Sequence, residues 1–419
     1  YLLSISCKIM IYIRLNKIFP FLLLTFPVIV DIINGYLKGT DGSGDSLLGI
    51  LYRGIIILFS CFYLFRTRYS NYIKVLLLSA VFLSVYQLII GGFSSRTFMM
   101  LIKILNFYFV ISLLLGCKYF SSYTQVVRSA IWYGVIAAFI LIYCFVFKVG
   151  YGSYTDETFG TKGFFVAMND VGLTILLLNI LACYSFQKTK NNNYLLASLV
   201  MSGGACLVGS MACFFGTAFI LLSFAISVLF MDFEDYKSSR TLKIIVVLFL
   251  FVIFNFLVIK IITIIQEDSF LSRKYADIME VFLSASGRDR LIDAAVRTIG
   301  NFNVFDWFFG KGNLFLIENQ RYLHFEAPKE AEVDPIDLIG QSGIIFSFFI
   351  LYIPIKKLFS CIKGFFKKHN ILDYWSVIAL FMFIGHACYG GHAYTSPLVL
   401  SYLAVFIYLI DNKNKINIS

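Results

Sequence analysis

The chain has 419 residues, of which 59% are hydrophobic and only 14% are charged. A soluble domain carries roughly 25% charged residues, so this composition excludes an ordinary soluble protein. The formal net charge of +11 would suit nucleic acid or an anionic substrate, but it is also typical of the basic loops of a membrane protein. No two cysteines have the CxxC spacing, so the sequence predicts neither a zinc site nor a disulfide framework.

Apolar runs follow one another along most of the chain, at the length of roughly 20 residues that a helix needs to cross a bilayer. The predicted spans lie near 18–36, 47–65, 73–93, 97–117, 129–149, 164–186, 194–210, 212–231, 244–265, 339–355, 372–389 and 394–411. We therefore expect an all-α integral membrane protein with about 12 transmembrane helices. Glycines before Ser210 predict a tight turn between the seventh and eighth spans.

Lysine and arginine indicate which way the spans point, because cytoplasmic loops are enriched in both. They gather in alternate loops, for example at Arg66 and Arg68 and at Lys188 and Lys190. The loops between these carry far fewer lysines and arginines. Both termini are therefore expected to lie in the cytoplasm.

One connection is much longer than the others and separates the ninth and tenth spans. We expect residues 10–265 to hold spans 1–9, residues 266–338 to form a large external loop, and residues 339–411 to hold spans 10–12. Apolar residues recur at helical spacing in the loop, as at Leu291 and Ala294, so it is expected to fold into short amphipathic helices. Structured loops of this length usually carry function.

The sharpest motif in this loop is SGRDR at residues 286–290. Its serine and first aspartate have the spacing of a helix-starting capping arrangement, which places Arg288 in the first helical turn. Backbone N–H groups favour an anion there, and an arginine fork can hold phosphate through two hydrogen bonds. Arg288 and Arg290 are therefore predicted to bind an anion. Ordinary helix electrostatics is the alternative, and Asp293 and Arg297 have the spacing of a mutual ion pair.

Acidic residues and a histidine precede the tenth predicted span. A reaction that activates a hydroxyl needs a base, and His324, Glu332, Asp334 or Asp337 could serve. Asp334 has a structural alternative, because aspartate followed by proline is typical of a helix start, with Asp337 one turn later complementing the helix dipole. His324 could equally be a solvated loop residue. His392, between the last two spans, could also line the site.

Ionisable residues inside apolar spans are costly and are therefore candidate functional residues. The sequence contains five of them: Asp31, Arg53, Lys103, Asp170 and His386. The residues expected toward the outer half of the membrane are Arg53, Arg96, Asn169, Asp170 and Arg288. Several cations converging there indicate an anionic lipid headgroup as ligand, although Asp31 and Arg53 could simply pair with each other. The chain lacks a Walker loop, a dinucleotide fingerprint and an HExxH motif, so no nucleotide, cofactor or metal is predicted.

Four segments together resemble the superfamily of O-antigen polymerases (Wzy-type) and O-antigen ligases. They are residues 27–35 with Leu51-Tyr52-Arg53, the segment from Gly163 to Asn169-Asp170, Ser286-Gly287-Arg288 with Phe309-Gly310-Lys311-Gly312, and Glu332-Val333-Asp334-Pro335 continuing to Gly343. The resemblance covers most of the chain through degenerate motifs. Ligases usually carry His-Asn where this chain has Asp334-Pro335, which favours a polymerase. The Ser-Arg common after the seventh span is Ser210-Met211 here, so the role of that arginine must lie elsewhere.

The resemblance implies a metal-independent glycosyltransferase of the GT-C type at the outer face of the bacterial plasma membrane. Such enzymes join undecaprenyl-diphosphate-linked oligosaccharide repeats, with inversion, into surface polysaccharide such as O-antigen or capsule. The site residues it suggests are Arg53, Arg96, Arg288 and Arg290 for the diphosphate, His324, Glu332, Asp334 and Asp337 as candidate bases, and Asn169, Asp170 and His392 lining the site. The implied partners are the lipid-linked donor and acceptor, membrane lipid and a chain-length regulator.

Two other functions are compatible with the sequence. A ligase that transfers the finished glycan to lipid A core or another acceptor differs only in its acceptor. A flippase or other transporter of lipid-linked oligosaccharide also has about twelve spans, but such proteins often show paired halves and broken helices. This chain shows no internal repeat and has its largest hydrophilic segment outside the membrane.

Overall fold

The computed structural model describes residues 18–38, 47–120, 122–153, 160–233, 236–248, 288–323 and 330–416. Most of these residues are helical, and within them two short strands form one antiparallel hairpin. Eight helices in these ranges are long and apolar enough to cross a membrane. The chain is therefore an all-α, multi-pass membrane protein, as its composition predicts.

The elements fall into two groups along the chain. The first group contains α2 (Pro27–Lys38), α3 (Leu47–Cys61), α4 (Ser70–Ile89), α5 (Ser95–Gly116), η1 (Lys118–Phe120), α6 (Tyr123–Phe147), β1 (Tyr151–Gly152), β2 (Thr161–Gly163), α7 (Met168–Thr189), α8 (Asn192–Leu207) and α9 (Met211–Leu229). The second group contains α12 (Arg288–Gly300), α13 (Val304–Phe309), α14 (Asn313–Leu323), α15 (Asp334–Lys368), α16 (Ile371–Tyr389), α17 (Pro397–Asp411) and α18 (Lys413–Ile416). Residues 18–24 and 240–248 are also helical.

The eight long apolar helices coincide with eight of the predicted spans: Ile18–Leu37, which includes α2, and α4, α5, α6, α7, α9, α15 and α16. Three further predicted spans correspond to the shorter helices α3, α8 and α17. Of the predicted span 244–265, residues 249–265 lie outside the described residues. The turn predicted before Ser210 is present, because α8 ends at Leu207, α9 begins at Met211, and Gly209 between them has a φ of +76°.

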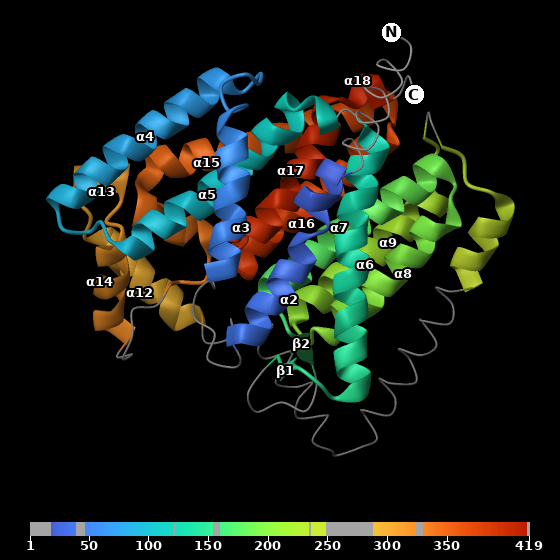
Figure 1. Cartoon of the computed structure of the whole chain (residues 1–419), viewed down its shortest axis with the longest axis horizontal. Coiled ribbons are helices and arrows are strands. Elements are labelled where there is room, and N and C mark those ends of the chain that lie inside the picture. The colour runs from blue at the N-terminus through green and yellow to red at the C-terminus, as the bar shows by residue number, and fades with distance from the viewer. Residues whose placement is uncertain are drawn as a thin grey trace, which may run out of the picture.

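The helices form a bundle whose two ends differ. Figure 1 shows the β1–β2 hairpin at one end and α18 at the other. The hairpin follows α6 and pairs Tyr151 with Gly163. It lies beside the end of α2, where a Cβ on Gly35 would clash with the carbonyl of Phe164. We refer to this end of the bundle as the hairpin end.

Helix α7 lies at the centre of the bundle and contacts α6, α8, α9, α16 and α17. In its most apolar stretch of 18 residues, 89% of the residues are buried inside the protein. Its polar side chains are therefore matched by neighbouring helices rather than by lipid. The Asn179 amide donates to Ser202 (2.9 Å), and Gln187 joins Ser227 (2.7 Å) to the indole nitrogen of Trp375 (2.8 Å). Such satisfied groups hold helices in register in an apolar interior.

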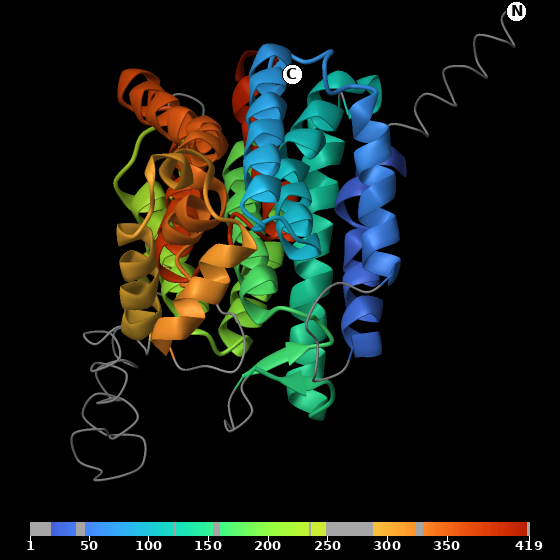
Figure 2. The ribbon, with the colours of Figure 1, turned by 90° about the vertical axis from the view of Figure 1, so that its left-hand side faces the viewer.

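Three short helices, α12, α13 and α14, occupy the described part of the predicted loop and lie together on one side of the bundle (Figure 2). The segment joining α13 to α14 is fastened to α15 by backbone hydrogen bonds. The Lys311 amide donates to the Gly340 carbonyl (2.9 Å) and the Gly312 amide to the Gln341 carbonyl (3.0 Å). The buried Gln87 side chain of α4 donates to the Gln341 carbonyl as well (2.6 Å). The Phe309–Gly312 motif is therefore an anchor for these helices.

A glycine-to-glycine contact makes this anchor possible. Gly343 interrupts α15 with a φ of 71° and a ψ of 171°, a region that only glycine adopts readily. A Cβ there would lie 2.5 Å from the Phe309 nitrogen, and a Cβ on Gly310 would lie 2.6 Å from the Gly343 nitrogen. Both positions must lack a side chain for the two backbones to meet. The result is a kink in α15 at Gly343.

Charged side chains tie α15 and α17 together at the opposite end of the bundle. The nearly inaccessible carboxylate of Asp411 pairs with Arg68 (3.2 Å) and with Lys357. The Tyr69 hydroxyl donates to the same carboxylate at 2.5 Å. One buried acid thus joins the start of α4 to two C-terminal helices.

Candidate functional site

A cavity of about 240 Å³ lies where α2, α3, α5, α7 and α17 meet at the hairpin end. Its polar lining is Asp31, Asn34, Arg53, Lys103 and Asp170, and its apolar lining includes Phe165 and Leu398. Asp31 and Asn34 come from α2, and the other three polar residues come from α3, α5 and α7. Four ionisable groups around one cavity inside an apolar bundle are costly, which makes this cavity the leading candidate for a functional site.

Each of the two acids of the cavity has a hydroxyl group beside its carboxylate. Asp31 accepts a hydrogen bond from the Tyr133 hydroxyl of α6 at 3.0 Å. Asp170 lies in the first turn of α7 and faces Ser396, which precedes α17. The carboxylates are thereby fixed on one wall, and Arg53 of α3 and Lys103 of α5 supply positive charge to the same space.

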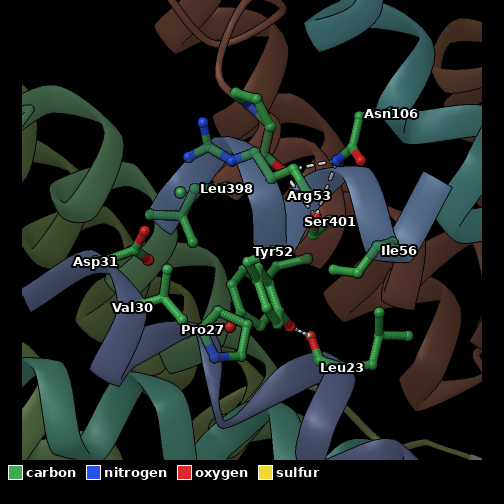
Figure 3. Close-up of a pocket in the computed structure, with 13 residues that line it drawn as sticks. Leu23, Pro27, Val30, Asp31, Tyr52, Arg53, Ile56, Asn106, Leu398 and Ser401 are labelled. Carbon is green, nitrogen blue, oxygen red and sulfur yellow. Dashed lines mark hydrogen bonds between the residues drawn. The ribbon is translucent and has the colours of Figure 1, made fainter. Parts of the chain in front are cut away.

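A smaller pocket continues from this cavity along α3 and shares Asp31, Arg53 and Leu398 with it. Figure 3 shows Arg53, Asn106 and Ser401 at one end of this pocket and Pro27 and Tyr52 at the other. The Asn106 amide donates to the Pro397 carbonyl (3.1 Å) and to Ser401 (3.2 Å), which fixes the start of α17 against α5. Arg53 of α3 lines the same pocket as these residues of α5 and α17.

A second cluster of charges joins α5 to the two segments that precede α15 and α17. The Glu330 carboxylate lies 3.5 Å from the Arg96 guanidinium and, through its other oxygen, 3.5 Å from Nδ1 of His392. Its side chain is only 21% exposed. Glu330 thus lies between a cation and an imidazole, with the Nδ1 edge of the ring toward its carboxylate.

The two clusters belong to one site. Asp170 of the cavity lies within electrostatic range of His392 as well as of Lys103 and Arg53. Asp170 therefore connects the cavity, which Arg53 and Lys103 line, to the cluster of Arg96, Glu330 and His392. Such a set can bind an anion and can accept a proton from a hydroxyl group held beside it.

Asp334 and Asp337, two of the predicted bases, accept hydrogen bonds from the backbone. Asp334 receives the Tyr394 amide at 2.8 Å, and Asp337 receives the Ala331 amide at 2.8 Å and the Val333 amide at 3.3 Å. Both side chains are buried. Their carboxylates hold the segments on which Glu330 and His392 lie, which favours a positioning role over proton transfer.

Backbone conformation in these two segments is unusual. Glu332 and His392 are both non-glycine residues with positive φ, 59° and 62° respectively. Gly391 precedes His392, and a Cβ on it would lie 2.5 Å from the Glu332 carbonyl oxygen. The two segments therefore pack backbone against backbone. Strained residues of this kind cost about 1–3 kcal/mol each and cluster at functional sites.

The helical stretch predicted through Arg297 is present as α12, and the residues before Arg288, including Ser286, lie outside the described residues. Arg290 is exposed and does not line the cavity. Arg297 pairs with Asp293 at 2.9 Å, as its spacing predicts. The Arg288 side chain and His324 lie outside the described residues, so their predicted roles stay predictions.

The structure brings Arg53, Arg96, Asp170 and His392 together, with Asn169 adjacent in the first turn of α7. Sequence reasoning overlooked Glu330 as the group that links them. One acid among several before α15 carries no local signal. Its partner Arg96 lies far away in the chain, so only the fold reveals their proximity.

No protein-family model matches the chain, and no curated protein is similar to it in sequence. A function therefore has to be inferred from the site and from the motif resemblance.

Proposed function

We propose that the chain is a glycosyltransferase that polymerises undecaprenyl-diphosphate-linked oligosaccharide repeats at the outer face of the bacterial plasma membrane. The observation that carries the proposal is a cavity lined by Arg53 and Lys103, whose Asp170 lies within electrostatic range of His392 in the Arg96–Glu330–His392 cluster. A membrane-embedded anion site beside a base suits a lipid substrate with a charged leaving group. The motif resemblance supports the same reaction.

The reaction has simple requirements. An acceptor hydroxyl oxygen attacks the anomeric carbon of the donor, and the bond from that carbon to the diphosphate oxygen breaks. The electron pair goes to the lipid diphosphate, and the hydroxyl proton goes to a base. The donor linkage is already activated, so no nucleotide takes part.

The residues of the site fit these requirements. Arg53 and Lys103 offset the charge that grows on the departing diphosphate, and they share the cavity with two acids, Asp31 and Asp170. His392 accepts the hydroxyl proton at Nε2, since the Glu330 carboxylate faces Nδ1. Arg96 holds Glu330 in place from α5.

The test uses lipid-linked repeat units extracted from the native bacterium after deletion of this gene. Purified protein in nanodiscs is mixed with them without nucleotide, and products are separated by length. We expect a ladder of lipid-linked oligomers from the wild type. Arg53→Gln is expected to lower the rate about 100-fold, as removal of one charge-stabilising donor does in other enzymes. The control Arg297→Gln changes an exposed arginine whose ion-pair partner among the described residues is Asp293 of its own helix, so its ladder should match the wild type.

One outcome would overturn the proposed site, and two would overturn the polymerase. A ladder that Arg53→Gln leaves unchanged removes the cavity from the reaction. Product that forms only when lipid A core is added identifies a ligase. Transport of the lipid-linked unit across the bilayer with no new glycosidic bond identifies a flippase.

A further inference from the structure

A groove lies between α6 and α8, away from the proposed site and near the other end of the bundle. It encloses about 640 Å³. Its lining runs from the first turns of both helices toward their middles and includes Gln125, Arg128, Trp132, Asn193, Ala197 and Val200. Both helices begin at the end of the bundle that the basic loops predict to be cytoplasmic.

Close packing of α6 against α8 borders the groove. A Cβ on Gly204 of α8 would lie 2.5 Å from the Ala138 Cβ of α6, so the two helices are in direct contact there. Gly134, one turn earlier in α6, packs against the Met201 side chain. The groove extends beside these contacts, along α6 from Thr124 to Phe139 and along α8 from Asn193 to Val200. We refer to it as the wedge, and its Arg128 end is the predicted cytoplasmic end.

The chemistry of the wedge changes along its length. Its predicted cytoplasmic end carries the exposed guanidinium of Arg128 with the amides of Asn191 and Asn193 nearby. Within the described part of the chain, Arg128 forms no ion pair. The deeper walls are apolar, and their rims remain exposed, at 48% for Trp132 and 61% for Leu196. In a membrane this face meets lipid, and tryptophan is enriched at the level of the headgroups.

We propose that this groove binds a phospholipid of the cytoplasmic leaflet that has an anionic headgroup. Arg128 and the two asparagine amides hold the headgroup phosphate, and one acyl chain lies in the apolar part between α6 and α8. A guanidinium provides paired donors for phosphate, and basic pockets on the cytoplasmic side of membrane proteins bind anionic headgroups. The cation and the amides lie at one end of the groove, where the headgroup would bind. The apolar part lies beyond them, where the acyl chain would bind.

Native mass spectrometry of the detergent-purified full chain tests this proposal. The protein is titrated with dioleoylphosphatidylglycerol and, separately, with dioleoylphosphatidylcholine. We expect one phosphatidylglycerol to be retained at least tenfold more than phosphatidylcholine. Arg128→Gln should abolish this preference. Arg66→Gln should keep it, because Arg66 is an exposed arginine at the same predicted end but does not line the groove.

A second variant separates the groove from simple surface charge. Ala197→Phe fills the apolar part while leaving Arg128 in place, and it should lose the retained lipid too. Retention unchanged in Ala197→Phe would overturn the proposal, as would equal binding of both lipids by the wild type. Retention of undecaprenyl diphosphate in preference to phosphatidylglycerol would assign the groove to isoprenoid lipid. A dimer that Ala197→Phe dissociates would assign it to a second copy.

Discussion

Replacing Gly343 by alanine tests whether the α15 kink anchors the helices α12–α14. Alanine at a φ of 71° and a ψ of 171° costs about 1–3 kcal/mol of backbone strain. The added Cβ would also lie 2.5 Å from the Phe309 nitrogen, so the anchor segment must move away. That movement weakens the two hydrogen bonds from Lys311 and Gly312 to α15, each worth about 1 kcal/mol. The expected total loss is about 3 kcal/mol.

The assay is thermal unfolding of the detergent-purified protein, followed by the loss of monodisperse protein in size-exclusion chromatography. We expect Gly343→Ala to unfold several degrees below the wild type. Gly310→Ala should do the same, and the double variant should be less destabilised than the sum, because both changes disrupt one contact. Gly385→Ala is the matched control: this glycine lies in α16, and an added Cβ there would meet nothing within 4 Å.

The control should unfold at or slightly above the wild-type temperature, since alanine is the better helix former. Gly343→Ala unfolding at the wild-type temperature would refute the reasoning. It would mean that α15 takes another path through the membrane and that Gly343 does not anchor the short helices.

Two further predictions concern the buried acids. Asp411→Asn should lower stability by about 2 kcal/mol, because it leaves Lys357 and Arg68 without their shared counter-ion, and chemical denaturation should show this loss. Asp334→Asn keeps an oxygen that can accept the Tyr394 amide, so polymer length in cells should stay near that of the wild type. Loss of polymer by Asp334→Asn at normal protein level would instead identify Asp334 as the base.

The membrane architecture could be predicted from the sequence because hydropathy is a local property. The apolar runs at α4, α5, α6 and α16 are long enough to span a bilayer wherever they occur, and the structure places helices there. The helix through Arg297 and the turn before α9 likewise depend on neighbouring residues, and both are present.

The contacts that build the site could not be predicted in this way. Nothing near Glu330 in the chain indicates that Arg96 and His392 lie on either side of it. Gly343 is one glycine in an apolar run, and its kink becomes apparent only once Gly310 packs against it. Asp334 and Asp337 were predicted as candidate bases from residue type alone. Their carboxylates accept hydrogen bonds from backbone amides, and the segments that carry these amides come close only in the folded protein.

The burial of α7 has a consequence for how the protein enters the membrane. Among the eight long apolar helices, α7 has the lowest mean hydropathy, 1.4, because it carries polar groups such as Asn179 and Gln187. Two of its neighbours, α16 and α17, are synthesised much later in the chain, and Trp375 of α16 completes the hydrogen bonding of Gln187. Until then the side-chain oxygen of Gln187 lacks this donor, and α7 is a marginal span. Its insertion should therefore depend on the strongly apolar α6, synthesised just before it, and on retention beside the translocation machinery until the last spans arrive.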